Sequence, residues 1–220
     1  MAKLPIFTVD LEFWFQAVCP YEEWDGFKRT INGLYDYLLV GQISNSETNT
    51  ICWLFSELNR RGISALVYVN GWMLEMNKKS IPQILKSLSV VGEKGSSHVF
   101  GSHGYSHRHN EKAGNESDIK TRKLMKDCEL EPSASYRSPY WDTTPMPWPP
   151  SGGFFFRSMP YTYVKWAVET SGVFWIHPHD VMENHPRLKN PLLNWKRRIG
   201  QKTARAKLER LLSEIEWGKP

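Results

Sequence analysis

Two histidines separated by three residues are the feature of this sequence that most directly suggests chemistry. Residues 101–107 read Gly-Ser-His-Gly-Tyr-Ser-His, so small residues surround His103 and His107 and allow close approach. In a helical turn, residues at this spacing share one face, with Cβ atoms about 5–6 Å apart. That spacing suits two imidazole nitrogens binding one divalent metal ion. Paired histidines also arise by chance on polar surfaces, so the spacing alone is a modest signal.

An acidic pair near the start of the chain strengthens the metal interpretation. The apolar, β-branched run Ile6–Val9 follows a proline and predicts a buried strand. Side chains alternate along a strand, so Asp10 and Glu12 point to the same side. A strand end emerging into solvent would also carry acidic residues, whereas buried carboxylates need a partner. Together with the histidines, the pair suggests one carboxylate for a metal and one for proton transfer.

The acidic pair and the histidine pair are two of several motifs in this sequence. Through these motifs the chain resembles the polysaccharide deacetylase (NodB-homology) family of carbohydrate esterases. Gly104 departs from the hydroxyl residue usual in the family's second motif. Blocks at 149–157 and 206–212 narrow the resemblance to exopolysaccharide deacetylases found at exosortase loci. Each motif is weak alone, but six in the family's order span nearly the whole chain. The four catalytic motifs are matched by Thr8-Val9-Asp10-Leu11-Glu12, by His103 to His107, by Arg137-Ser138-Pro139-Tyr140, and by Ile176-His177-Pro178.

The resemblance implies metal-dependent hydrolysis of N-acetyl groups from an amino-sugar polysaccharide or its precursor. Where the second carboxylate sits two residues after the first, that carboxylate is the expected ligand. Glu12, His103 and His107 would then bind one divalent ion, and we expect zinc. Asp10 would be the general base, although Asp10 and Glu12 could exchange roles.

The remaining roles also follow from the resemblance. Arg137 would pair with Asp10 and keep it ionised. The backbone N–H of Tyr140 would bind the oxyanion of the tetrahedral intermediate, and His177 would protonate the leaving amine. Asp180 or Glu183 could orient the imidazole of His177, and the sequence does not choose between them.

Other interpretations of these residues remain open. His177 could be a hydrogen-bonded core histidine, and Arg137 could be a surface arginine before a proline turn. We interpret His109 and His179 as bystanders. Four tryptophans are candidates to stack on sugar rings, although any one of them could instead pack in the core: Trp14, Trp24, Trp141 and Trp148.

Alternating apolar segments predict an α/β fold with a parallel sheet. The family implies a distorted, incomplete (β/α) barrel, with the chemistry at the C-terminal ends of the strands. We find no linker or repeat and predict one domain over residues 1–220, closed by a helix at about 202–216. The expected strands are 6–10, 63–69, 99–100 and 173–176, and the other expected helices are 50–61, 81–91, 116–126 and 159–171.

Composition limits the remaining possibilities. With 220 residues, 40% of them hydrophobic, the chain can bury a sizeable core. No run reaches the roughly 18–20 apolar residues of a transmembrane helix. No signal segment precedes Ile6, and Cys19, Cys52 and Cys128 are irregularly spaced, so we expect reduced thiols and a cytoplasmic location.

The net charge of +5 comes partly from the C-terminal region. A basic helix can bind nucleic acid or an anionic membrane surface, but it is more often a solvated face. We recognise no nucleic-acid-binding module and expect no nucleic-acid partner. The basic residues are Lys196, Arg197, Arg198, Lys202, Arg205, Lys207 and Arg210.

The connection between Tyr140 and Pro149 is short, where related enzymes carry a strand and a helix. We therefore expect a shallow, open cleft that accepts a polymer or a carrier-linked glycan. The alternative is a catalytically inactive carbohydrate-binding protein on the same scaffold. Asp10 and His177 favour the enzyme, since metal binding alone needs neither.

Overall fold

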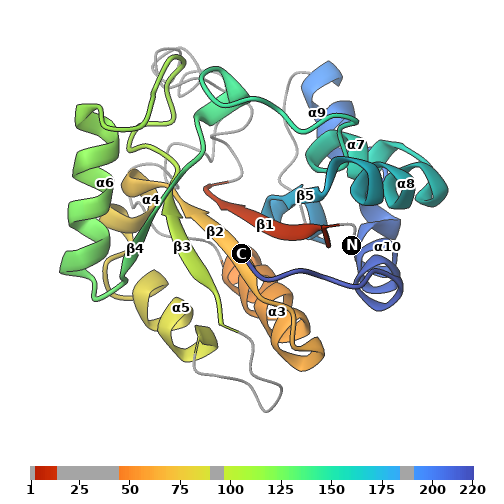
Figure 1. The fold of residues 1–220 in the computed structure, drawn as a ribbon, viewed down its shortest axis with the longest axis horizontal. Coiled ribbons are helices and arrows are strands. Elements are labelled where there is room, and N and C mark those ends of the chain that lie inside the picture. Colours follow the sequence, from red (N-terminus) through yellow and green to blue (C-terminus); the bar gives the residue numbers. More distant parts are fainter. Residues whose placement is uncertain (1–2, 14–44, 90–96, 184–190) are drawn as a thin grey trace.

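A computed structural model describes residues 3–13, 45–89, 97–183 and 191–220, and its centre is one parallel sheet of five strands. The strands lie in the order β4-β3-β2-β1-β5 (Figure 1). Every neighbouring pair of strands is parallel, so the carboxyl ends of all the strands lie at the same end of the sheet. The strands are β1 (Ile6–Leu11), β2 (Ala65–Val69), β3 (Val99–Ser102), β4 (Pro132–Tyr136) and β5 (Val173–Ile176).

The strand order is that of an open barrel. The first four strands are neighbours in chain order, and β5 returns to the free side of β1. A closed barrel would pair β4 with β5, but these two strands form the opposite edges of the sheet. The predicted α/β class with an incomplete barrel is therefore confirmed.

Helices cover the sheet and its edges. Figure 1 shows α6 along the β4 edge and α7 and α8 at the β5 edge. Within the described ranges, every helix is too short or too polar to span a lipid bilayer. The helices are α3 (Asn45–Arg61), α4 (Gly71–Met76), α5 (Ile81–Ser89), α6 (Glu116–Asp127), α7 (Gly153–Ser158), α8 (Tyr161–Ser171), α9 (Pro191–Arg198) and α10 (Gln201–Glu214), with 3-10 turns η2 (Pro139–Trp141) and η3 (Pro178–Val181).

Several boundaries differ from the sequence-based expectation. Helix α3 begins at Asn45 rather than at Thr50, and Glu47 lies in its first turn, where the helix dipole favours an acidic group. Helices α4, α7 and α9 and strand β4 were not predicted. They are short, and β4 lacks the β-branched alternation that marks a strand.

The core explains why β1 lies in the interior of the sheet, between β2 and β5. Phe7, Val9 and Leu11 of β1 are fully buried, and Phe7 packs against Phe174 of β5 and Trp217 near the C-terminus. The backbone N–H of Gly218 donates to the carbonyl of Pro5 at 2.9 Å, so the C-terminal segment lies beside the start of β1. On α10 a stripe with helical spacing faces the core: Ala204, Leu208, Leu211 and Leu212.

Candidate active site

The acidic pair lies at the carboxyl end of β1, an interior strand of the sheet. Asp10 is in β1, and Glu12 follows its last residue. Both carboxylates are only 2% exposed, so the interpretation of a solvated strand end is wrong. Burial opposes the charge on Glu12, but the nearby imidazoles of His107, His177 and His103 hold its pKa well below the usual range.

His103 and His107 lie in the loop after β3, not on a helix. Gly104 and His107 have φ of 68° and 56°, left-handed values that an α-helix excludes. The assumption of a helical turn is therefore wrong. The loop still brings the rings together, with centroids 5.2 Å apart, and the backbone N–H of His103 donates to the carbonyl of Val69 at 3.0 Å.

The three predicted ligands converge. One ligand atom from each of Glu12, His103 and His107 lies within 4.8 Å of the others. Nε2 of His103 is 3.3 Å from Oε2 of Glu12, and Nε2 of His107 also contacts that oxygen. Nδ1 of His103 hydrogen-bonds the carbonyl of Arg137 at 2.9 Å, which directs Nε2 toward Glu12.

The chemistry of this group fits a metal ion. Both oxygens of Glu12 are buried, and in the described residues neither forms a hydrogen bond of good geometry, although Nε2 of His103 and of His107 lie against Oε2. An unsatisfied buried carboxylate is costly, and a cation would remove that cost. Two imidazole nitrogens and one carboxylate oxygen form the type of three-ligand set that holds catalytic zinc.

Arg137 lies against the second carboxylate. Its Nη1 donates to Oδ1 of Asp10 at 2.6 Å, and the guanidinium lies between the rings of Tyr68 and Trp141, 4.2 and 4.4 Å from their centroids. Arg137 is buried, so the interpretation as a surface arginine is wrong. The arginine occupies one oxygen of Asp10 and leaves Oδ2 facing the site.

His177 follows β5 and faces both carboxylates. Its Nε2 is 3.5 Å from Oε1 of Glu12 and 3.9 Å from Oδ2 of Asp10. Its Nδ1 hydrogen-bonds Oδ2 of Asp180 at 3.0 Å, whereas Glu183 pairs with Arg205. Between the two candidates to orient this imidazole, the structure places Asp180 in contact. Burial opposes protonation, but the surrounding carboxylates raise the pKa of His177 to about 9.

Arg157 is a residue whose position sequence reasoning missed. Its Nε donates to Oδ1 of Asp180 at 2.8 Å, within a buried ion pair. The sequence offered it only as part of a motif block, and no local pattern links it to Asp180, 23 positions away. Asp180 therefore accepts from His177 on one oxygen and from Arg157 on the other.

The expected bystanders have different surroundings. His179 is buried and stacks on His177, with centroids 4.6 Å apart, and burial and the Arg197 charge hold its pKa well below the usual range. His109 is exposed and hydrogen-bonds Asp142 at 2.7 Å. His177, His179 and Asp180 form a second group of possible metal ligands. This group fits a metal less well, because both oxygens of Asp180 already accept hydrogen bonds, one from His177 and one from Arg157.

The contacts around Gly104 explain why this position lacks the hydroxyl residue that is usual in polysaccharide deacetylases. A Cβ at this position would lie 1.8 Å from Oε2 of Glu111. The other carboxylate oxygen accepts from the hydroxyl of Ser106 at 2.6 Å, which ties Glu111 to the loop between the two histidines. Glu111 was not among the predicted site residues, because its partner is set by the loop geometry.

Tyr140 and Trp141, at the start of the short connection, pack against site residues. Tyr140 has φ of 55°, and its ring packs on His107 with centroids 4.7 Å apart. Trp141 lies over Arg137 and against Trp175. These two rings therefore lie against site residues, and the open cleft over the ligands stays a prediction. The side chain of His177 is 15% exposed, so the site is not sealed.

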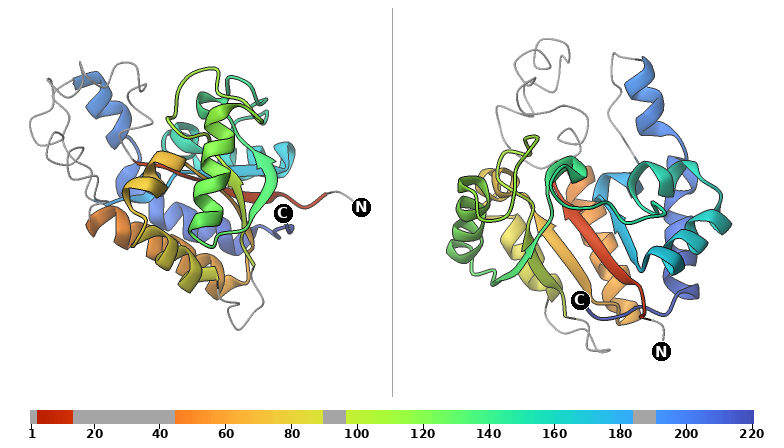
Figure 2. Two further views of the ribbon diagram at one scale, coloured as in Figure 1. Left: turned by 90° about the vertical axis from the view of Figure 1, so that its left-hand side faces the viewer. Right: turned by 45° about the horizontal axis from the view of Figure 1, so that its top comes forward.

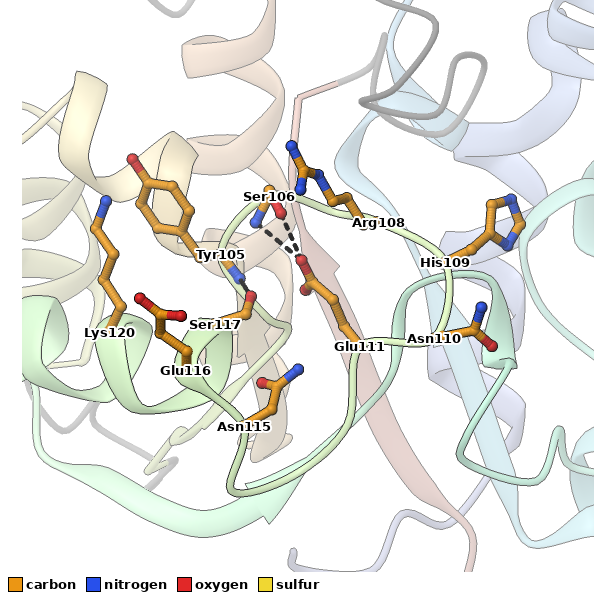
Figure 3. Close-up of a pocket in the computed structure, with 10 residues that line it drawn as sticks. All are labelled: Tyr105, Ser106, Arg108, His109, Asn110, Glu111, Asn115, Glu116, Ser117 and Lys120. Carbon is orange, nitrogen blue, oxygen red and sulfur yellow. Dashed lines mark hydrogen bonds between the residues drawn. The ribbon is translucent and has the colours of Figure 1, made fainter.

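A polar pocket of about 470 Å³ lies beside the loop that carries His107 (Figure 3). Tyr105, Ser106 and Glu111 form the side shared with this loop, and the start of α6 supplies Ser117 and Lys120. Among the candidate sugar-stacking tryptophans, Trp148 is 81% exposed, and Trp14 and Trp24 lie outside the described residues.

Comparison with known proteins adds a family match over part of the chain. Residues 138–220 match a family described as a domain of unknown function, DUF3473. This region includes Tyr140, Arg157 and His177. No curated protein sequence matches the chain.

Similar solved structures define the class of fold. Wild-type BA3943, a CE4 family pseudoenzyme from Bacillus anthracis, has a TM-score of 0.53 at 8% identity, over 99% of this chain and 63% of that one. A BA3943 mutant with restored enzymatic activity has a TM-score of 0.51 at 8% identity, over 96% and 63%. The Bc1960 peptidoglycan N-acetylglucosamine deacetylase has a TM-score of 0.51 at 14% identity, over 99% and 86%.

These similarities establish the fold. This chain has the α/β fold of the CE4 polysaccharide deacetylases. It spans about 63% of the length of BA3943. At these identities the likeness concerns the fold alone, and the activity must be argued from the site.

Proposed function

We propose that this protein is a metal-dependent deacetylase that hydrolyses N-acetyl groups of an amino-sugar polysaccharide or its precursor. One observation carries the proposal: a buried ligand group lies beside an arginine-held Asp10 and an aspartate-held His177. Metal binding alone requires neither of these last two residues. Amide hydrolysis is accelerated by a base that takes a proton from the attacking water and an acid that gives a proton to the leaving amine.

Glu12, His103 and His107 would hold the ion, and we propose zinc. When bound, a divalent ion polarises the acetyl carbonyl and lowers the pKa of a water molecule. The mixed nitrogen and oxygen ligand set suits a borderline ion of this kind.

The chain's own groups would carry the protons. Asp10 would take a proton from the attacking water through Oδ2, since Arg137 occupies Oδ1. His177 would give a proton from Nε2 to the amine as the C–N bond breaks, and Asp180 would keep its Nδ1 as a donor. The backbone N–H of Tyr140 would stabilise the oxyanion. The products are acetate and a free amino sugar, which balances the addition of one water.

The comparisons supply support and a competing possibility. Bc1960 is a peptidoglycan N-acetylglucosamine deacetylase, whereas BA3943 is a pseudoenzyme, so this fold occurs with and without activity. The alternative for this chain is an inactive carbohydrate-binding protein. We favour the enzyme because Nε2 of His177 faces the carboxylates of both Asp10 and Glu12. Membership of the exosortase-locus subgroup, the single domain over 1–220 and the cytoplasmic location stay predictions.

The substrate would be a glycan chain rather than a free sugar. The pocket in Figure 3 is lined by polar side chains that suit sugar hydroxyls, and it adjoins the loop that carries His107. Contacts to a neighbouring sugar would supply binding energy used in the transition state. We therefore propose that kcat/KM rises from N-acetylglucosamine to its oligomers.

Acetate release from a panel of N-acetylated monomers and oligomers tests the proposal. Zinc-loaded wild type should release acetate from oligomers, and the Asp10→Asn variant should release little. Oligomer binding without acetate release would favour the inactive carbohydrate-binding protein. Equal kcat/KM for monomer and oligomer would contradict the proposed substrate class while leaving the reaction intact.

A further inference from the structure

The segment from Pro191 to Leu208 carries basic residues and no acidic residue. The structure separates these cations into two groups. The cations in the first group are buried or have partners: Arg197 is buried, Arg205 pairs with Glu183, and Nζ of Lys207 donates to the carbonyl of Met159 at 2.8 Å. The cations in the second group are exposed and form no ion pair with any described residue: Lys196, Arg198 and Lys202.

Helix α9 also exposes large apolar side chains. Leu192 is 62% exposed and Trp195 is 54% exposed. Residues three apart share one face of a helix, so these two side chains form one apolar stripe. Lys196 is four positions after Leu192, and Arg198 is three positions after Trp195, so a cation borders the stripe on each side.

The orientation of α9 is fixed by its inner side. Arg197 points inward, and Nη1 of Arg157 donates to the carbonyls of Arg197 and Ile199 at 2.9 and 3.1 Å. These bonds satisfy the C-terminal carbonyls of α9. The opposite face, with Leu192 and Trp195, is therefore held outward.

Position and charge together indicate the kind of partner. The right-hand view of Figure 2 shows α9 projecting from the end of the molecule at which β1 ends. Beside it, a hollow of about 360 Å³ is lined by Arg198, Lys202 and Arg205, with Glu183 and Gln201. An apolar stripe bordered by cations is the pattern of a helix that lies in a membrane interface and attracts anionic lipids.

We propose that α9 and the first turn of α10 form a docking surface for the face of a membrane that contains anionic lipids. Leu192 and Trp195 enter the interface, and Lys196, Arg198 and Lys202 contact lipid phosphates. The docking does not depend on the proposed deacetylase activity. It would hold the end of the molecule that carries the candidate site toward the lipid surface.

Vesicle co-sedimentation of the full chain tests this surface. The protein should bind vesicles of phosphatidylcholine with phosphatidylglycerol and should bind pure phosphatidylcholine much more weakly. Each cation contributes about fivefold to binding, so Lys196→Glu, Arg198→Glu and Lys202→Glu together should weaken it by about a hundredfold or more. Leu192→Ser with Trp195→Ser should also weaken it, and added salt should weaken binding of the wild type.

Matched variants on other faces serve as controls. Trp166 on α8 is 52% exposed, and Lys123 and Lys126 are exposed on α6. Trp166→Ser and the pair Lys123→Glu with Lys126→Glu should leave vesicle binding unchanged. Thermal melting by circular dichroism checks that each variant folds.

Three results would overturn the proposal. One is equal binding, or no binding, to both kinds of vesicle. Another is an equal loss in the control variants. The third is binding to DNA that needs the three cations but not Leu192 and Trp195, because this would identify a site for nucleic acid rather than for lipid.

Discussion

The two histidine-bearing segments of the site are built in different ways. The loop that carries His103 and His107 is shaped by the left-handed backbone at Gly104 and by the two hydrogen bonds that Ser106 donates to Glu111. His177 is placed by Asp180, and Asp180 is held by Arg157, which comes from α7 and also binds the end of α9. The ligand side therefore depends largely on the backbone geometry of its own loop, together with the carbonyl of Arg137 that orients His103. The other side depends on one buried ion pair between distant segments.

The largest effect should come from removing a metal ligand. His103→Ala should reduce bound zinc from about one equivalent to none and abolish acetate release, because two ligands cannot complete a three-ligand site. Elemental analysis after zinc loading and desalting measures this. His109→Ala, which changes an exposed histidine outside the ligand group, is the control. Equal metal content in wild type and His103→Ala would refute the site.

Variants of the two proton-transfer residues, Asp10 and His177, should separate metal binding from catalysis. Asp10→Asn and His177→Ala should each keep the metal and lower kcat by about 10²–10⁴-fold, as expected for a positioned acid or base. Metal content and kcat are measured on the same preparations. If Asp10→Asn releases the ion while Glu12→Gln keeps it, the roles of the two carboxylates are reversed.

Breaking the ion pair should disturb only the His177 side. Arg157→Ala leaves Oδ1 of the buried Asp180 without its charged partner and should cost about 3–5 kcal/mol of unfolding free energy. It should also lower kcat and move the pH profile of kcat, since Asp180 orients His177.

Arg122→Ala is the matched control for this variant. Arg122 also joins an aspartate, Asp118, to backbone carbonyls, but it lies on α6 away from His177. It should reduce stability without moving the pH profile. A shifted profile in Arg122→Ala, or an unchanged one in Arg157→Ala, would contradict the positioning role.

The charge on His177 should make the metal-free protein less stable at high pH. The folded pKa of about 9 lies above the unfolded value of about 6.5, so this stabilisation is complete below pH 6.5 and is lost as the pH rises through 9. The loss should reach about 3 kcal/mol. Denaturant unfolding of chelator-treated protein at several pH values measures it.

The His177→Gln variant identifies the source of this pH dependence. Its stability should fall less steeply over the same range, although not become flat, because the pKa of His103 is also raised. An identical slope in wild type and His177→Gln would show that His177 does not carry the effect.

The smallest effect should come from placing at position 104 the hydroxyl residue that is usual in polysaccharide deacetylases. Gly104→Ser would bring a Cβ within 1.8 Å of the Glu111 carboxylate, at a φ of 68°. Left-handed strain alone costs about 1–3 kcal/mol. Gly114→Ser is the control, because Gly114 has φ of 78° and open space around it. Tm should fall further for Gly104→Ser than for Gly114→Ser, and equal falls would exclude a role for the Glu111 contact.

Sequence reasoning succeeded where the signal was local or carried by the resemblance. Apolar runs located β1, β2 and β5, and the ordered motifs named the residues that meet at the carboxyl ends of the strands. It failed at α4, α7 and α9, whose six to eight residues are too few to show a helical period. It also did not locate the rings of Tyr140 and Trp141, because the length of the connection does not reveal that they pack on His107 and Arg137.

The sequence by itself determined the parallel α/β fold and the set of chemical groups, because strand periodicity, helix periodicity and motif order are properties of neighbouring residues. Only the tertiary structure decided how those groups are held. It chose Asp180 over Glu183 beside His177, placed Arg157 behind Asp180, and put Glu111 against Gly104. Arg157 and Asp180 are 23 positions apart and meet only when the chain is packed. Asp180 and Glu111 are near their partners in sequence, but the folded turn of each loop, and not a sequence pattern, selects them.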